Sequence, residues 1–258
     1  MFMRKFFLLP LLVLSLGIAA QQAGVMYVAA RSGLSIREKP DASSKVLDKI
    51  PYGTKITLIS DTLELKNLTT EGIVGYWQKV KYNTKTGYIL DSYLFPWPPP
   101  KLATVKEMKN YFSQVTLPFG SKLVVKNSTI NNYVEMDGWE ITKQLYKNGA
   151  EWHHYSGYEA GSDAYFLPQF TMEQGFLLLR LIPEFKDVFG EKDEFPTENK
   201  TYKKGDVEYT VTVYKQVWEG QVAPYVDRIH IEFSPDASYE FDMYIIDGEL
   251  VITFGGGV

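Results

Sequence analysis

Apolar and polar side chains alternate along several short runs in the first third of the chain, a pattern typical of half-buried β-strands. Proline, glycine and asparagine residues that favour turns separate these runs. The predicted strands are 25–29, 34–37, 55–60, 75–82 and 87–90. Five or six short strands in so little chain favour a small closed β-barrel, because closure hides the edges of the sheet.

The remainder of the chain combines further strands with two predicted helices. Each helix begins at a capping box, Thr104-Val105-Lys106-Glu107 or Thr171-Met172-Glu173-Gln174, and Pro183 should kink or end the second helix. Strands are predicted at 121–126, 133–142, 151–158, 207–214, 228–233, 239–245 and 249–254. The turn Asp247-Gly248 joins the last two, so the last four strands should form an antiparallel meander.

These elements predict a fold that is mainly β or α+β, in which one or two helices cover one face of an antiparallel sheet. The glycine tail, Gly255 to Gly257, is expected to fray. Four prolines within 95–101 cannot belong to a helix or a central strand. We expect residues 96–101 to act as a semi-rigid linker between a barrel at 25–95 and an α+β domain at 102–258.

The N-terminus has the three parts of a secretory signal. Arg4 and Lys5 precede an apolar run at 6–16, and small residues follow it. The run is shorter than the roughly 20 residues that a membrane-spanning helix needs. We therefore expect residues 1–20 to be a cleaved signal peptide, with no membrane span left afterwards and a periplasmic or secreted product. An uncleaved anchor is the alternative.

Residues 27–94 resemble the bacterial SH3 domains (SH3b) of exported and cell-wall proteins. Four segments carry the resemblance in the family's order: Leu34-Ser35-Ile36-Arg37-Glu38-Lys39-Pro40, Ser44-Lys45-Val46-Leu47 with Gly53-Thr54-Lys55-Ile56, Gly75-Tyr76-Trp77-Gln78-Lys79-Val80, and Gly87-Tyr88-Ile89-Leu90-Asp91-Ser92-Tyr93-Leu94. Ser35 stands where the family usually has asparagine, and 61–73 is longer than the family's tight loop. The resemblance implies a small SH3-like β-barrel whose partner is cell-wall peptide or an envelope protein.

Composition excludes several kinds of chemistry. None of the 258 residues is cysteine, which rules out disulfides, a thiol nucleophile and the cysteine-dependent peptidase found in many exported SH3b proteins. The net charge is −4 and there is no basic block, so we expect no nucleic-acid partner. His153 and His154 are adjacent on a predicted strand and should face opposite sides. With only His230 in addition, we expect no metal site and no cofactor.

Aromatic side chains are the candidate ligand-binding groups of the barrel, and we single out Trp77, Tyr76 and Tyr93. Strict alternation puts Trp77 opposite Val80, so either a bulge turns its ring inward or the ring lies on the surface. Such rings either fill the barrel core or form a shallow groove for a peptide or glycan. In the second half, five aromatic residues either belong to the core or a sheet face, or line a similar cleft: Trp139, Trp152, Tyr155, Tyr158 and Tyr165.

Together these features predict an exported, non-enzymatic binding protein of the bacterial envelope. The alternative is a wall-glycan hydrolase in which Glu135 and Asp137, on one face of a predicted strand, act as acid and base. A third hypothesis is a structural lock, in which the barrel packs on the second domain and its groove is covered. Burial of Trp77 by residues beyond 101 would favour that lock.

Overall fold

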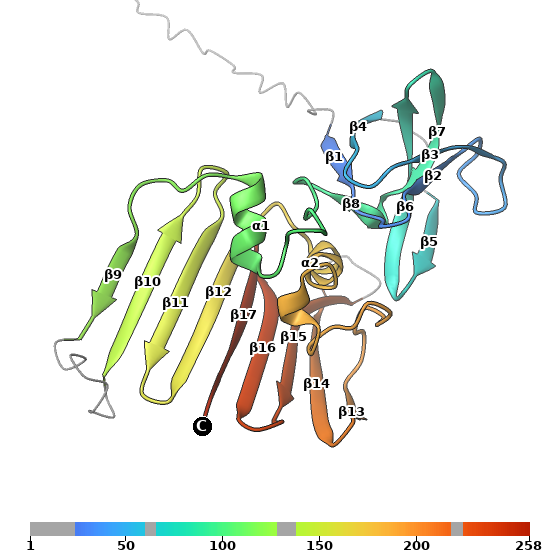
Figure 1. The fold of residues 1–258 in the computed structure, drawn as a ribbon. Coiled ribbons are helices and arrows are strands. Elements are labelled where there is room, and N and C mark those ends of the chain that lie inside the picture. The colour runs from blue at the N-terminus through green and yellow to red at the C-terminus, as the bar shows by residue number, and fades with distance from the viewer. Residues whose placement is uncertain (1–23, 60–65, 128–137, 218–223) are drawn as a thin grey trace, which may run out of the picture.

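The computed structural model describes residues 24–59, 66–127, 138–217 and 224–258. The predicted signal peptide lies outside this range. The described chain forms two antiparallel sheets, a barrel at the N-terminal end and a nine-stranded sheet after it (Figure 1). This arrangement confirms the predicted α+β, mainly β fold. No helix in the described ranges is long and apolar enough to span a membrane.

The barrel contains all five strands that alternation predicted there, and three that it did not. Its strands are β1 (Val25–Val28), β2 (Leu34–Arg37), β3 (Val46–Ile50), β4 (Lys55–Ile59), β5 (Asn67–Thr70), β6 (Ile73–Tyr82), β7 (Lys85–Leu90) and β8 (Leu94–Phe95). The three that were not predicted are β3, β5 and β8. They pair in the order β3-β2-β7-β6-β4-β1-β8, with β5 on β6. The unpredicted β5 lies in the long insertion and lengthens the hairpin that ends in β6. A buried aliphatic core fills the barrel: Val28, Leu34, Ile36, Ile50, Ile56, Val80, Ile89 and Leu94.

The second sheet has nine strands. They are β9 (Leu123–Lys126), β10 (Trp139–Leu145), β11 (Glu151–Gly157), β12 (Ala160–Pro168), β13 (Lys200–Lys204), β14 (Val207–Gln216), β15 (Tyr225–Phe233), β16 (Ser238–Ile246) and β17 (Glu249–Gly257). Their order is β13-β14-β15-β16-β17-β12-β11-β10-β9. The predicted meander of the last four strands is confirmed. Neither β12 nor β13 was predicted. In β12 the reason is the Gly161-Ser162-Asp163 stretch, which lacks alternating apolar residues.

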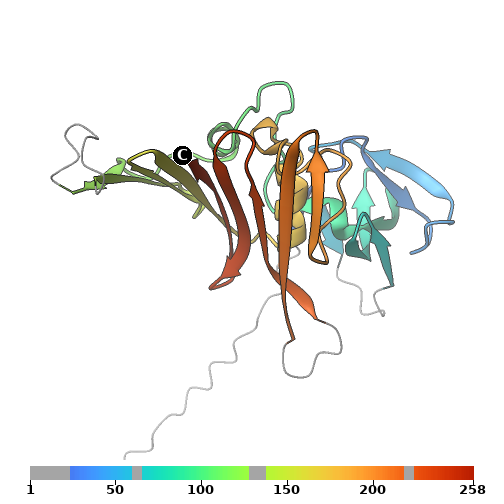
Figure 2. The same cartoon turned by 90° about the horizontal axis from the view of Figure 1, so that it is seen from below.

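Two helices, α1 (Met108–Val115) and α2 (Met172–Leu179), pack on one face of this curved sheet (Figure 2). The second begins where its capping box predicts, since Thr171 Oγ1 accepts a hydrogen bond from the Gln174 amide at 3.2 Å. It ends before Pro183, as expected. The first was predicted too early, because Asn110 Oδ1 accepts from the Glu107 amide at 3.3 Å and thereby caps a helix that starts at Met108.

The C-terminal glycines do not fray, contrary to expectation. They belong to β17 and pair with β12 on one side and β16 on the other. A Cβ atom at Gly255 would collide with Ser162 and with the carbonyl oxygen of Gly161. Glycine is therefore needed here because the neighbouring strand approaches so closely.

The proline-rich segment 96–101 does not hold the barrel and the second domain apart, as a semi-rigid linker would. Phe95 and Trp97 are buried, and their rings meet Phe170 of the second domain at centroid distances of 5.6 and 5.0 Å. The Tyr52 hydroxyl of the barrel donates to the Pro100 carbonyl at 2.7 Å. One apolar core therefore extends from the barrel into the helices and the sheet. The prolines make this segment stiff, but they do not hold the two parts apart. Burial of the Phe95 and Trp97 rings against the second domain stabilises the docked arrangement.

Candidate functional site

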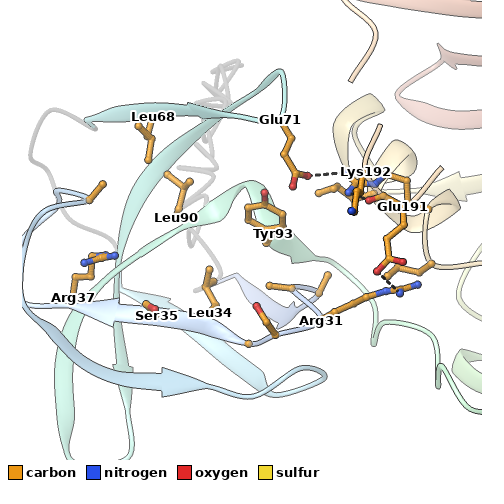
Figure 3. A pocket seen from close by; sticks show the side chains of 18 of the residues that line it. Arg31, Leu34, Ser35, Arg37, Leu68, Glu71, Leu90, Tyr93, Glu191 and Lys192 are labelled. Carbon is orange, nitrogen blue, oxygen red and sulfur yellow. Dashed lines mark hydrogen bonds and ion pairs between the residues drawn. The ribbon is translucent and has the colours of Figure 1, made fainter. Parts of the chain in front are cut away.

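A cavity of about 580 Å³ opens at the junction of the barrel and the second domain (Figure 3). The barrel contributes most of its lining, including Leu34, Leu68 and Leu90. The second domain contributes five residues from α2 and the following segments: Leu177, Arg180, Leu181, Glu191 and Lys192. The site is therefore composite, and neither part forms it alone.

Trp77 lies in the wall of this cavity. Its ring faces away from the barrel core, opposite Val80, as strict alternation predicts. The pairing of β6 with β7 shows no register shift, so the bulge alternative is wrong. The surface alternative is also wrong, because Trp77 is only 7% exposed. The ring is nearly buried and lines the cavity at the junction between the two domains, a location that a sequence pattern for one barrel cannot reveal.

Tyr93 lines the same cavity, from the short 3-10 helix Asp91–Tyr93. Burial and the neighbouring Glu71 carboxylate raise the pKa of Tyr93 to about 12. Its phenol is therefore neutral at physiological pH and can donate a hydrogen bond. Tyr76 is 41% exposed and does not line the cavity, because it projects from the other face of β6. The structure thus brings together two of the three predicted site residues and separates the third.

Charged side chains surround the cavity. Arg180 Nη1 lies 2.6 Å from Glu71 Oε2, and Arg31 Nη1 lies 2.7 Å from Glu191 Oε1. Both ion pairs join the barrel to the second domain (Figure 3). With Arg37 and Lys192, the lining holds four basic and two acidic side chains, although the whole chain is acidic. The cavity is therefore locally positive.

This lining is suited to binding a ligand with both apolar and anionic groups. Aliphatic side chains and the Trp77 and Tyr93 rings supply apolar contact area. Arg31 and Arg180 already pair with Glu191 and Glu71. A ligand carboxylate would therefore meet the Lys192 ammonium and the remaining N–H groups of Arg31 and Arg37. Arg31, Arg180, Glu191 and Lys192 could not be predicted from the sequence, because only the fold brings positions so far apart in the chain around one cavity.

Comparison with known proteins identifies the first part of the chain. Residues 32–95 match the family model of the bacterial SH3 domain. The N-terminal barrel is a bacterial SH3 domain. The resemblance predicted for 27–94 is thereby confirmed. Bacterial SH3 domains are cell-wall binding modules, typically found outside the cell or in its envelope. Beyond the SH3 domain no family is recognised, and no curated protein or solved structure matches the chain.

A polar cluster lies outside the SH3 domain, on the helix-covered face of the second sheet. Asp163 Oδ1 accepts from Trp152 Nε1 at 2.6 Å and lies 3.0 Å from His154 Nδ1. Glu184 accepts from the Tyr165 hydroxyl at 3.2 Å and from the first amide of α1 at 2.7 Å. Burial raises the pKa of Glu184. These bonds fasten α1 and the segment after α2 to the sheet.

The other candidate groups of the second domain do not form a common cleft with this cluster. Trp152 and Tyr165 face the helices, whereas Tyr155 projects from the opposite face of the sheet. The aromatic cleft is therefore wrong, because the strand period of two divides its members between two faces. The alternative that these rings belong to the core holds for Trp152 and Tyr165, which are buried. Glu135 and Asp137, the acid and base of the hydrolase alternative, lie outside the described residues.

Proposed function

We propose that this protein is an exported, non-enzymatic binding protein of the bacterial envelope, and that its SH3 domain holds cell-wall peptide in the junction cavity. The observation that carries the proposal is the placement of Trp77 and Tyr93 in one cavity with an excess of basic side chains. Peptides that bear free carboxylates offer both kinds of contact that this lining can make.

Export is supported by the predicted signal peptide at residues 1–20 and by the usual location of bacterial SH3 domains. The absence of cysteine supports a non-enzymatic role in one respect. It excludes the cysteine-dependent peptidase that often accompanies bacterial SH3 domains. In this proposal the second domain acts as part of the receptor, since α2 and residues 191–192 complete the cavity.

A second candidate is the structural lock, and the apolar core that extends from the barrel into the second domain favours it. In a lock, the SH3 domain stabilises the second domain and the cavity binds nothing. The two candidates differ in one measurable respect. A receptor loses retention on the cell wall when a cavity residue changes, whereas a lock loses only stability.

The test is co-sedimentation of the purified protein with insoluble peptidoglycan. Lys192→Glu reverses a charge at the cavity without removing buried apolar surface, and we expect it to weaken retention at least tenfold. Trp77→Ala should weaken it further. Tyr76→Ala is the matched control, because this neighbouring ring lies outside the cavity, and it should sediment like the unchanged protein. Far-UV circular dichroism verifies that each variant is folded.

Retention that is absent, or that is equal in the unchanged protein and Lys192→Glu, would refute the receptor proposal. If retention is absent while Trp77→Ala strongly lowers thermal stability, the structural lock is supported. A zymogram on wall material checks the non-enzymatic part of the proposal. A cleared band would refute it.

A further inference from the structure

The second sheet ends in an exposed apolar edge, far from the SH3 domain (Figure 1). Its last strand, β9, pairs with β10 on one side, and residues 117–119 continue this edge along the end of β10. The Phe119 amide donates to the Leu145 carbonyl at 2.8 Å, and the Lys147 amide to the Leu117 carbonyl at 2.9 Å. Five large apolar residues of the edge are 43% to 65% exposed: Leu117, Phe119, Leu123, Val124 and Val125.

Backbone geometry shows which groups of β9 point outward. The Asn127 amide donates to the Trp139 carbonyl at 3.3 Å, so these two residues form a hydrogen-bonded pair. In an antiparallel ladder such pairs alternate, which means that Val125 and Leu123 also bond to β10. The amides and carbonyls of Val124 and Lys126 therefore point away from the sheet. Within the described ranges, no strand pairs with that side of β9.

We propose that this edge accepts an extended acidic segment of a partner protein, which adds to β9 as an antiparallel strand. Lys122 and Lys126 project to the same face as Val124 and bracket it. In the free protein the Lys122 ammonium lies 5.1 Å from the centroid of the Trp152 ring, and Lys126 is opposite Glu140 of β10, so pairing with an added strand would compete with these two contacts. Acidic side chains of the added strand would lie opposite these lysines. Apolar side chains of the added strand would lie opposite Leu123 and Val125 on the other face, where Ile141 on the neighbouring strand extends the apolar surface.

Charge is what selects this occupant over a second copy of the chain. In a symmetric pairing of two β9 strands centred on Val124, Lys122 of each copy would lie opposite Lys126 of the other. Like charges that are directly opposite destabilise a strand pair, and edge lysines are a common device against self-association. An acidic strand turns the same two lysines into attractive cross-strand pairs. The lysines thus oppose self-pairing and favour an acidic partner.

The probe is a fluorescein-labelled peptide of sequence Thr-Glu-Val-Thr-Val-Glu-Thr, and its matched control carries lysine in place of both glutamates. Fluorescence anisotropy with the purified protein should give at least tenfold tighter binding for the acidic peptide at low salt. The difference should shrink at high salt because the pairs are exposed. In the double variant Lys122→Glu and Lys126→Glu, the preference should reverse.

The backbone part of the proposal is tested at Val124. Val124→Pro removes an amide that points to solvent and should weaken binding of the acidic peptide at least tenfold. Val124→Thr retains the amide and should bind within about twofold of the unchanged protein. Equal binding of the two peptides, no binding of either at millimolar concentration, or unchanged binding by Val124→Pro would overturn the proposal. A concentration-dependent dimer in light scattering, without peptide binding, would assign the edge to a second copy instead.

Discussion

Phe170 offers the most direct test of whether the SH3 domain and the second domain form one cooperative unit. It lies between β12 and α2, is 3% exposed, and contacts Phe95 and Trp97 at the end of the barrel. Its ring therefore bridges the two domains. Phe170→Ala would remove this bridge without touching the lining of the cavity, which does not include Phe170.

The expected cost follows from burial. Replacing a fully buried phenylalanine by alanine costs about 3–5 kcal/mol, and the cost is greatest where the site cannot collapse. Two tilted or edge-on ring contacts add to the area term by about 0.5–1.5 kcal/mol each, which places Phe170→Ala in the upper part of that range. For a chain of this size, each 1 kcal/mol lowers the melting temperature by roughly 2–4 °C. We expect a decrease of about 10 °C.

The assay combines calorimetry with hydrogen exchange. Phe170→Ala should keep a single transition at lower temperature, and amides of β2 and β7 in the SH3 domain should lose protection together with those of β15 and β16. Phe119→Ala is the matched control, since the same substitution at a ring that is 65% exposed should cost about 0.5 kcal/mol or less. If the SH3 domain amides retained full protection while the second domain weakened, the two parts would not be coupled and the shared core would have no energetic meaning.

Three other changes test separate features. Glu71→Gln should lower the unfolding free energy in urea by about 1 kcal/mol, because the ion pair to Arg180 is partly screened by solvent; no change would show that the pair does not hold the domains together. Gly175→Ala places a Cβ against the buried Leu250 side chain and should cost about 1–3 kcal/mol in thermal unfolding, whereas a gain would show that the helix relaxes freely. His230 is partly buried, which lowers its pKa, but hydrogen bonds to two flanking carboxylates outweigh burial and raise the pKa above 6.5. Its stabilising contribution is therefore complete below pH 6.5 and is lost as pH rises through the folded pKa. The difference in unfolding free energy between the unchanged protein and His230→Gln should shrink as pH rises. A difference that stays constant with pH would refute this.

Local sequence patterns predicted the strands and helices well where a single interaction, such as burial of one face or capping of one end, determines the element. Alternation located strands such as 207–214 because one face of β14 is buried and the other is not. Thr171 marked the start of α2 because its hydroxyl satisfies an otherwise unpaired amide. The capping-box sequence at Thr104 predicted the wrong start for α1, because such a sequence carries no information on where the chain makes tertiary contacts. At α1 the first amide is bound by Glu184, a residue far along the chain, and this contact accompanies the later start.

The site could be predicted only in part, and the reason is geometric. The Gly-x-Trp motif singled out Trp77, and the period of a strand predicted that its ring points away from Val80. The cavity beside the ring could not be predicted, because Arg180 and Lys192 complete it from a domain in which no family is recognised. Tyr76 was wrongly grouped with Trp77 because adjacency in a motif does not imply adjacency in space, and in a strand it implies the reverse.

The shared core has a consequence for how the SH3 domain acts. Ala29, Ile73 and Phe95 belong to the barrel by sequence, yet they are buried in the core that extends into the second domain. A barrel cut out after Phe95 would expose this apolar surface to water and would lack the α2 side of its cavity. Under the proposed function, a substitution on the α2 side should therefore alter ligand binding without touching any residue of the SH3 domain. Any such effect would identify the second domain as part of the binding site.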